Sequence, residues 1–555
     1  MRRPAGPART LPAMAGYSGT PLPRELDVSG HGRDSADVVV VGGGHNGLVA
    51  ATLLARSGLD VALFERAPTL GGAARTENCF PAVPGLRQST GAYLLGLMPP
   101  EVLALAGDRI RPLRRDPHYV LPTAGGPGSP YLWFGSDRDA TRAQMERTFS
   151  AADVWADDAL QAELAALRED LAPAWLAEPL AVEDTAERYI RPGLRKAFVD
   201  LVRGSVVDYL ARFGFTSELL VAMYVVTDGL SGLTAGPDTA GTGHNFLVHN
   251  MCRLPGADGT WMVAEGGMGA VSAAFAEAAA SAGARLFTGT EVAALSVDGG
   301  AVDGVVLADD TLVSARAVLA ACDPWRAAAI AGEHVPADLV ERLERIRRTG
   351  TTLKVNLALR GLPRLACLPD GAPSPWGSTV HLLPDATGRP LEALRSMWRE
   401  VEAGHLPDFP TIEWYVHTTV DPSLRDDAGH HSSALFVQSV PYQPVDATWS
   451  EAIGPYVDHL LEIADRFAPG TSDLVADTFP LPPPAIEDHF GITGGHIHHV
   501  DNGVAFADRV PYVTGLPGLY AGSAGCHPAG SVIGAAGWNS ARRLIADLGV
   551  RPTDG

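Results

Sequence analysis

The chain has 555 residues, of which 46% are hydrophobic and 19% are charged, and its formal net charge is −21. Such a chain is globular and can bury a large core without disulfides or structural metals. The strongly negative charge disfavours nucleic acid and anionic lipid headgroups as partners. No run of about 18 apolar residues is present, so any membrane contact would be peripheral rather than transmembrane.

Cysteine usage and the N-terminal segment bear on the compartment. The five cysteines are scattered and none is at CxxC spacing, which indicates a reducing, cytoplasmic compartment and argues against zinc or a dithiol redox site. Residues 1–36 contain several arginines, but their prolines forbid the amphipathic helix of a transit peptide. We therefore predict a disordered tail over residues 1–36, with Met14 as an alternative start of translation.

The first ordered segment has the pattern of a dinucleotide-binding βαβ unit. The β-branched run Asp37–Val41 is typical of a strand buried on both faces of a parallel sheet. A helical stretch, Leu48–Arg56, and a second strand, Val61–Phe64, follow it. Between the first strand and the helix lies a glycine-rich turn in GxGxxG register, and Glu65 ends the second strand at the spacing of a ribose-binding acid.

Each residue of this motif has a physical role. Gly42 allows the tight turn, Gly44 lets the backbone approach a pyrophosphate, and Gly47 lets the helix pack closely on the strand. The helix N-terminus faces the anion, and Glu65 accepts hydrogen bonds from a ribose diol. The motif therefore predicts a dinucleotide site.

A second glycine motif indicates which dinucleotide is bound. Six residues after Glu65, the chain reads Gly71-Gly72-Ala73-Ala74-Arg75-Thr76. This extension resembles the motif of the flavoprotein superfamily that includes amine oxidases and phytoene desaturases, in which the ligand is FAD. We expect FAD, with NAD as the alternative.

From Pro100 to about Leu233, spaced apolar residues predict helices, which we interpret as an inserted cap. The predicted helices are Ala140–Phe149, Ala159–Leu171, Leu194–Tyr209 and Ser217–Val226. The glycine cluster Gly266–Gly269 then opens an Ala-rich helix, Ala270–Ala282. Because no long β run precedes this cluster and no acid-ended strand follows it, we interpret it as a helix-packing feature.

The later part of the chain predicts further strands. Glu291–Val297, Gly304–Leu307 and the run from Ala317 are strand-like, and the last of these returns the chain to the parallel sheet. From Thr351 the hydrophobic period becomes two, as it does in Ile412–His417 and Ala434–Gln438. These segments predict a second, largely antiparallel sheet. The chain closes with a strand at Leu519, a glycine-rich turn and a helix that reaches Leu548.

Three separated segments resemble one family. The opening "FERAPTLGGAARTENCFPAVPGLRQSTGAYLLGL", the middle "WMVAEGGMGAVSAAFAEAAASAGARL" and the close "GLYAGSAGCHPAGSVIGAAGWNSA" are similar to the phytoene desaturase/carotenoid isomerase superfamily of FAD flavoproteins. The most similar branch is the phytoene-dehydrogenase-related proteins labelled pyridine nucleotide-disulphide oxidoreductases. The resemblance implies an α/β fold with a Rossmann-type FAD-binding domain built from three chain segments. It also implies a substrate domain with a mainly antiparallel sheet and a helical cap.

The resemblance implies domain boundaries and cofactor-binding residues. The FAD-binding domain would comprise residues 37–100, 251–335 and 485–555, the helical cap 101–250, and the rest of the substrate domain 336–484. The residues expected to bind FAD are Gly42, Gly44, Asn46, Gly47, Glu65, Arg66, Gly72, Ala73, Arg75, Thr90, Val292, Cys322, Gly522, Ser523, Ser531 and Val532.

Lys354 and two histidines are the candidate catalytic residues. Lys354 stands on a strand whose other face is apolar, and in amine oxidase relatives a lysine on a similar strand holds a water against flavin N5. A cation there stabilises the reduced, anionic flavin; the alternative is a solvated surface lysine. His499 matches a family position near the active site, and His527 would lie at the flavin edge. Both are candidate proton acceptors, and both could instead be structural.

The segment Gly494–His499 places His496 and His498 on one face of an expected strand and His499 on the other. An HxH pair can bind metal, but no third ligand is identifiable, so we predict no metal site. His249 lies in a further segment, "FLVHNM", that resembles the family. No nucleophile motif and no Walker-type loop is present, which argues against hydrolases and kinases.

We predict an FAD-dependent oxidoreductase that desaturates an apolar polyene-, isoprenoid- or lipid-like small molecule by hydride transfer to flavin N5. Only one dinucleotide motif is present, so the electrons are expected to pass to oxygen or a quinone rather than to come from NAD(P)H. The alternatives are a flavin-dependent double-bond isomerase, an amine oxidase and a non-enzymatic flavin-loaded scaffold. The sequence does not name the substrate or the oligomeric state.

Overall fold

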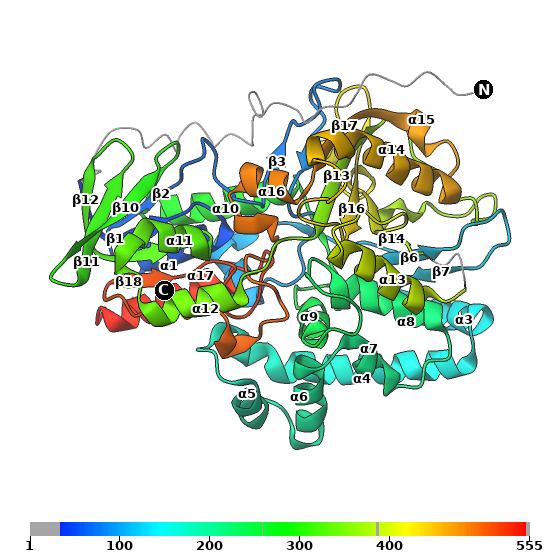
Figure 1. Cartoon of the computed structure of the whole chain (residues 1–555), viewed down its shortest axis with the longest axis horizontal. Coiled ribbons are helices and arrows are strands. Elements are labelled where there is room, and N and C mark those ends of the chain that lie inside the picture. Colours follow the sequence, from blue (N-terminus) through cyan, green and yellow to red (C-terminus); the bar gives the residue numbers. More distant parts are fainter. Residues whose placement is uncertain (1–33, 258, 385–387, 551–555) are drawn as a thin grey trace.

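The computed structural model describes residues 34–257, 259–384 and 388–550, so most of the predicted disordered tail lies outside the described residues. Two seven-stranded sheets organise the described part of the chain. They lie toward opposite ends of the long axis, and a layer of helices lies below the second sheet (Figure 1). The predicted α/β class is confirmed.

The first sheet has the strand order β10-β11-β12-β1-β2-β9, with β18 beside β12. Strand β1 is parallel to β12 and β2, and β18 is parallel to β12, whereas β10, β11 and β12 form antiparallel hairpins. As predicted, the valine run of β1 is buried on both faces. The strands are β1 (Ser35–Val41), β2 (Val61–Phe64), β9 (Arg285–Phe287), β10 (Val292–Asp298), β11 (Ala301–Leu307), β12 (Leu312–Ala320) and β18 (Leu519–Ala521).

Helices from three distant segments cover this sheet. Helix α1 (His45–Arg56) contacts α10 (Met268–Ser281) and α17 (Ala535–Asp547), while α11 (Pro324–Ala331) contacts β10. The approach of α17 to α1 is close, because a Cβ at Gly537 would overlap the backbone of Asn46. The sheet and its helices are thus assembled from three chain segments, as the resemblance implied.

The second sheet has the order β17-β13-β16-β15-β14-β6-β7 and is mainly antiparallel. The period of two in β13 sorts its side chains as predicted: Leu353, Val355 and Leu357 enter a core shared with α14 (Trp449–Phe467), and Lys354 lies on the other face. The strands are β6 (Tyr119–Pro122), β7 (Tyr131–Phe134), β13 (Thr352–Leu359), β14 (Thr379–Leu382), β15 (Thr411–Val416), β16 (His431–Gln438) and β17 (Val475–Leu481).

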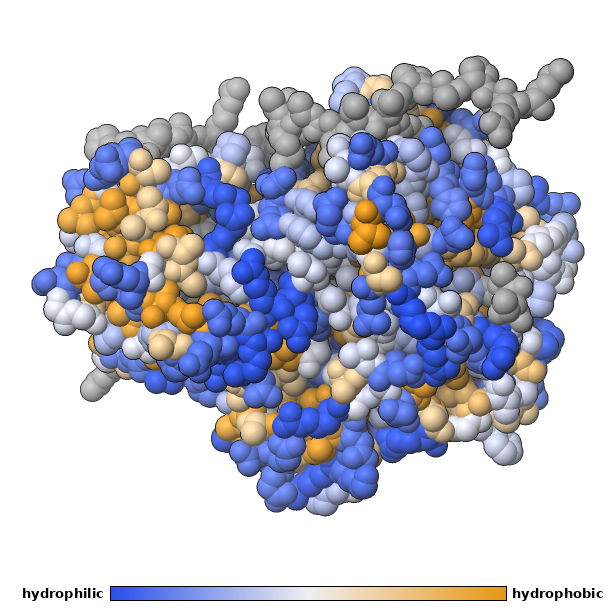
Figure 2. Space-filling model, in the orientation of Figure 1, coloured by the Kyte–Doolittle hydropathy of each residue, from blue (hydrophilic) through white to orange (hydrophobic). Residues whose placement is uncertain are grey.

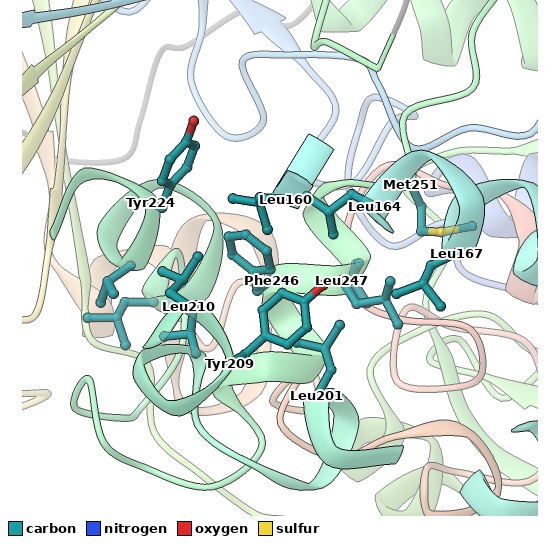
Figure 3. Close-up of a cluster of buried hydrophobic side chains, with 14 of the residues drawn as sticks. Leu160, Leu164, Leu167, Leu201, Tyr209, Leu210, Tyr224, Phe246, Leu247 and Met251 are labelled. Carbon is teal, nitrogen blue, oxygen red and sulfur yellow. The ribbon is translucent and has the colours of Figure 1, made fainter. Parts of the chain in front are cut away.

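The predicted cap is largely helical. Its helices pack around a buried apolar cluster that includes Leu160, Leu164, Tyr209 and Phe246 (Figure 3). The predicted single helix Leu194–Tyr209 is instead two helices, because Gly204 ends the first and the Ser205 side chain caps the second. The helices are α3 (Arg138–Thr148), α4 (Ala151–Leu171), α5 (Val182–Tyr189), α6 (Arg195–Arg203), α7 (Val206–Ala211), α8 (Glu218–Tyr224) and α9 (Thr242–His249).

Two features differ from the predictions. Strands β6 and β7 lie within the predicted cap segment but belong to the second sheet. The expected strand around His496–His499 is absent, because this stretch forms turns after the short helix at Thr493–Gly495. The remaining elements are α2 (Pro100–Leu103), α12 (Ala337–Ile346), α13 (Pro390–Glu402), α15 (Thr471–Leu474), α16 (Pro483–Phe490), β3 (Thr76–Glu77), β4 (Gln88–Ser89), β5 (Pro112–Leu113) and β8 (Val263–Ala264).

The visible face of the molecule is mainly hydrophilic, with apolar side chains gathered over the β10–β12 hairpins (Figure 2). Leu312, at the start of β12, is 52% exposed. Within the described ranges, no helix has the length and apolar character needed to cross a bilayer.

Arg509 joins the loops of the closing segment. It is 1% exposed, and its guanidinium donates to the backbone carbonyls of residues 500, 501, 504, 524 and 526 and to the Asn502 side chain. Arg509→Met would leave these buried acceptors without a donor, so we expect a loss of more than about 3 kcal/mol of unfolding free energy. Chemical denaturation of the wild type and the variant measures this loss. Arg342→Met removes two comparable bonds from a less buried arginine and should cost markedly less; equal costs would contradict the proposed role of Arg509.

Candidate functional site

A cavity of about 480 Å³ extends between the two sheets. One part is lined by the carboxyl ends of β1 and β2 and the start of α1, and another part by β13, β15, β16 and the cap. In open α/β sheets, ligands bind at the carboxyl ends of the parallel strands. The cavity therefore connects a dinucleotide-type position with the second sheet.

The glycine turn after β1 forms a cradle at the first end. Gly42 has φ +106°, a conformation that favours glycine, and Gly44 begins α1 in an extended conformation. The space beside Gly44 is open: the nearest atom to a Cβ placed there would be the Cα of Gly72, at 4.0 Å. Both residues line the cavity, so the backbone is open to a close-fitting ligand at the N-terminus of a 12-residue helix.

Glu65 organises the same end. Its carboxylate accepts hydrogen bonds from the backbone N–H groups of Gly43, at 2.7 Å, and Ala67, at 2.8 Å. A carboxylate has about four acceptor positions, so two remain for a ligand diol. The residue lines the cavity in the position expected of a ribose-binding acid.

Lys354 projects into the other end of the cavity. It is 5% exposed, so the alternative of a solvated surface lysine is wrong. Its Nζ lies 3.9 Å from the ring centroid of Tyr93 and 4.5 Å from that of Phe436. These cation–π contacts stabilise the ammonium ion, yet burial lowers the pKa of Lys354 to about 7.

Glu413 shares this end with Lys354. Cross-strand register aligns Lys354 with Phe436 and Phe436 with Glu413, so the three positions follow one row across the sheet. The Glu413 carboxyl accepts hydrogen bonds from the hydroxyl of Tyr415 and from Nε2 of Gln438. Burial raises the pKa of Glu413 to about 7.

The profile of a family described as "Flavin containing amine oxidoreductase" matches residues 47–404. The chain belongs to this family. It is 31% identical over 559 residues to the mouse (Mus musculus) protein "Pyridine nucleotide-disulfide oxidoreductase domain-containing protein 2", covering 92% of this chain and 94% of that one. It is also 26% identical to hydroxyneurosporene desaturase of Cereibacter sphaeroides, covering 93% and 98% of the two chains.

Solved structures show the same fold. An oxidoreductase from Methanosarcina mazei matches with a TM-score of 0.59 and 16% identity, covering 92% of this chain and 99% of that one. Putrescine oxidase bound to putrescine matches with a TM-score of 0.54 and 16% identity, covering 93% and 99%. Family and fold together identify the protein as an FAD-dependent oxidoreductase, and the open cradle at Gly44 and Gly72 fits FAD.

Most of the residues expected to bind FAD line the cavity. They are Gly42, Gly44, Asn46, Glu65, Arg66, Gly72, Ala73, Val292, Cys322, Ser531 and Val532. These residues come from all three segments of the domain, so the structure brings distant parts of the chain together at one site. Their direct contact with FAD remains a prediction.

Five of the expected residues do not line this cavity. Gly47 is a packing residue, because a Cβ there would overlap the carbonyl oxygen of Gly42. A Cβ at Gly522 would lie 2.9 Å from Leu319, and the Ser523 hydroxyl accepts from Gly525 N–H.

The other two, Arg75 and Thr90, belong to a buried network around Glu77. The Thr90 hydroxyl donates to the Glu77 carboxylate, and His489 Nε2 lies 2.9 Å from it. Arg75 donates to the carbonyl oxygens of Gly72 and His489. Arg75 is therefore linked directly to Gly72 of the cradle, whereas Thr90 is linked to Glu77.

The two candidate histidines have different positions. His499 lines the cavity with φ +60°, and burial lowers its pKa to about 4, so its ring is neutral near pH 7. His527 is 1% exposed and does not line this cavity; its Nε2 lies 2.9 Å from the carbonyl oxygen of Ala174. The expectation that His527 lines the pocket is therefore wrong.

The HxH pair has protein partners. His496 Nε2 lies 3.2 Å from the Asp501 carboxylate, and His498 Nε2 lies 3.1 Å from the carbonyl oxygen of Ser231. In the part of the chain that the structure describes, no group of three His, Cys, Asp or Glu side chains is arranged to hold a metal ion.

Sequence reasoning missed several cavity residues, among them Tyr93, Asp228, Glu413 and Tyr415. Glu413 and Tyr415 could have been found, because they alternate with buried apolar residues on β15. Asp228 carries no such signal, since its position depends on how the cap folds over the sheet.

FAD binding has a direct test. We expect FAD to be released when the purified protein is denatured, and Glu65→Ala to weaken binding by the loss of two hydrogen bonds of about 1–2 kcal/mol each. Chromatography of the extract and fluorescence titration of apoprotein measure these effects. Arg56→Ala, on the far turn of α1, is the control. Extraction of NAD instead of FAD would overturn the assignment of the dinucleotide.

Proposed function

We propose that the protein desaturates a mainly apolar small molecule and passes the electrons to oxygen or a quinone. The observation that carries the proposal is the continuous cavity, which leads from the FAD cradle to a region lined by Tyr93, Tyr415, Phe436 and Trp261. Aromatic side chains bind apolar ligands through large buried contacts. The similarity to hydroxyneurosporene desaturase supports the same reaction class.

Bound FAD would supply the two-electron acceptor of this chemistry. Lys354 would hold an ammonium ion at the substrate end of the cavity, and the neutral imidazole of His499 would be available to accept a proton. The aromatic side chains would orient the substrate and exclude water from it.

Amine oxidation is a second candidate because the family name denotes it. The aromatic pair Tyr93 and Phe436 could bind a substrate ammonium, but Lys354 already places its own ammonium against both rings. Desaturation therefore fits this cavity better.

Desaturation predicts a product that lacks two hydrogens, together with consumption of oxygen or an artificial acceptor. Mass spectrometry of candidate isoprenoids and lipids incubated with the FAD-loaded protein tests this. An isomer formed without acceptor consumption would favour the isomerase, and hydrogen peroxide with ammonia would favour the amine oxidase. Absence of any photoreduction or turnover would favour the scaffold.

We expect NADH and NADPH not to reduce the flavin at a useful rate. The backbone N–H groups of the glycine cluster Gly266–Gly269, at the start of α10, already bond to protein side chains. The Met268 N–H donates to Ser89 Oγ, and the Gly269 N–H donates to Thr76 Oγ1. A Cβ at Gly267 would lie 2.5 Å from Thr76 Oγ1, so this turn is a packing feature. Anaerobic mixing with NADPH in a stopped-flow spectrophotometer is the measurement, and rapid bleaching of the flavin would contradict the expectation.

A further inference from the structure

Asp228 is a buried carboxyl group that faces the cavity. It is 8% exposed and lines the cavity together with Tyr119, Ser231 and His249. Its Oδ2 accepts one hydrogen bond, from Asn250 Nδ2 at 3.3 Å, and its Oδ1 lies 3.8 Å from His249 Nδ1. Among the residues that the structure describes, no Lys or Arg side chain forms an ion pair with it.

The charge of Asp228 is therefore poorly compensated by the protein. Burial lowers the pKa of His249 to about 4, so this neighbour is neutral near pH 7. Burial also raises the pKa of Asp228 to about 7. A buried carboxyl with unfilled hydrogen-bonding positions is costly unless a ligand fills them.

The backbone around Asp228 is held in a fixed position. Asp228 lies in a π-helical turn, Val225–Leu230, a geometry that is frequent at functional sites. The buried Asn245 side chain donates to the carbonyl oxygens of Asp228, Gly229 and Ser231, at 3.1 to 3.2 Å. This single amide therefore fixes the turn that presents the carboxyl group.

The same network reaches the predicted FAD loop. Asn502 Nδ2 donates to Asn245 Oδ1 at 3.1 Å, and the Asn502 side chain exchanges two hydrogen bonds with the backbone of Gly530. Gly530 precedes Ser531, which lines the cavity. Asp228 is thus positioned relative to the cofactor end of the cavity by a short chain of buried amides.

A hydroxyl group on the ligand fits this site better than an ammonium ion. A hydroxyl both donates and accepts, so it can bond to the carboxyl group in either protonation state. An ammonium ion only donates, and it would share the cavity with the ammonium of Lys354.

We infer that Asp228 binds a hydroxyl group of an otherwise apolar substrate and so sets which molecules enter in the productive orientation. The inference rests on the proposed function for the apolar body of the substrate. An apolar molecule that carries no hydrogen-bond donor should therefore be a poor ligand. The Asn245–Asn502 network positions the carboxyl group, and His249 closes one side of it.

Calorimetric titration of the FAD-loaded protein with octan-1-ol and with 1-methoxyoctane tests this inference. The two probes share an apolar chain, but only the alcohol donates a hydrogen bond. We expect the alcohol to bind at least about tenfold more tightly, which corresponds to about 1.4 kcal/mol. Asp228→Leu should reduce the preference to below about threefold, and Asp228→Asn should give an intermediate value because its amide oxygen still accepts.

Asp157→Asn is the matched control, because Asp157 is a cap carboxyl that bonds to Tyr224 and does not line this cavity. It should keep the full preference for the alcohol. Equal binding of alcohol and ether by the wild type, or an unchanged preference in Asp228→Leu with normal FAD content, would overturn the inference. Octylamine binding more than about tenfold tighter than octan-1-ol would overturn the choice of a hydroxyl. These titrations need no turnover, so their failure leaves the separate test for desaturation unaffected.

Discussion

Gly44→Val is expected to lower the affinity of the apoprotein for FAD at least about hundredfold, about 2.7 kcal/mol, while leaving the apoprotein folded. The reason is the open space at this residue: a Cβ would approach only the Cα of Gly72, at 4.0 Å. The valine side chain would enter the cradle where the pyrophosphate is expected. Its backbone, at φ −72° and ψ 171°, is extended, which valine adopts without strain.

Gly47→Ala, three residues further on, is the matched comparison. A Cβ there would overlap the carbonyl oxygen of Gly42 and lie 3.1 Å from the Ala321 side chain, so this variant should lose stability as well as FAD. Fluorescence titration with FAD and thermal unfolding of the apoprotein separate the two effects. Wild-type affinity in Gly44→Val would place the dinucleotide away from this cradle.

The opening βαβ unit could be predicted from sequence because its determinants are local. The valine run of β1, the glycine spacing and Glu65 all lie within about 30 residues, the size of one βαβ unit. The period of two in β13 likewise predicted which of its faces is apolar. What periodicity could not show is whether the opposite face meets solvent or a cavity, and the burial of Lys354 answers this.

Several predicted site residues lie outside the cavity because of contacts distant in sequence. Arg75 and Thr90, whose binding to FAD stays a prediction, lie in a network around Glu77 that is joined by the His489 side chain, more than 400 residues along the chain. His527 turns toward the carbonyl oxygen of Ala174 in the cap. Asp228 reaches the cavity because the cap folds over the second sheet. Spacing along the chain contains no signal for such pairings.

The strands β6 and β7 were missed for a related reason. Each has only four residues, too few for a clear alternation, and β6 pairs with β14, about 260 residues later in the chain. Because strand propensity depends on neighbouring strands, short strands in a helical segment are hidden from single-sequence patterns.

Lys354→Met is expected to retain FAD and to slow the reoxidation of photoreduced flavin by oxygen at least about tenfold, about 1.4 kcal/mol of barrier. Lys354 is the buried cation of the β13 face of the cavity, and a cation stabilises negative charge that develops nearby in a site of low dielectric. Methionine preserves the length and the packing against Tyr93 and Phe436 but removes the charge. Stopped-flow absorbance after anaerobic photoreduction measures the rate.

The pH dependence gives the same prediction a second readout. Burial lowers the pKa of Lys354 from 10.5 to about 7, so the ammonium is present below pH 7 and is lost as the pH rises through that value. The wild-type rate should therefore fall above about pH 7, and the rate of Lys354→Met should not. Glu413, whose pKa burial raises to about 7, titrates in the same range, so Glu413→Gln is the control. It should keep the step but move it to lower pH, because the Glu413 carboxylate raises the pKa of Lys354.

The free energy of unfolding of the apoprotein should change with pH in the opposite direction to the reoxidation rate. Between pH 7 and 10.5 the unfolded chain binds a proton at Lys354 that the folded chain does not, so the free energy of unfolding rises with pH through this window. Lys354→Met removes this contribution, and denaturation at several pH values would show a flatter profile. If Lys354→Met reoxidised at the wild-type rate and kept the wild-type pH step, the ammonium would have no role in reoxidation. Lys354 would then serve only to pack against Tyr93 and Phe436.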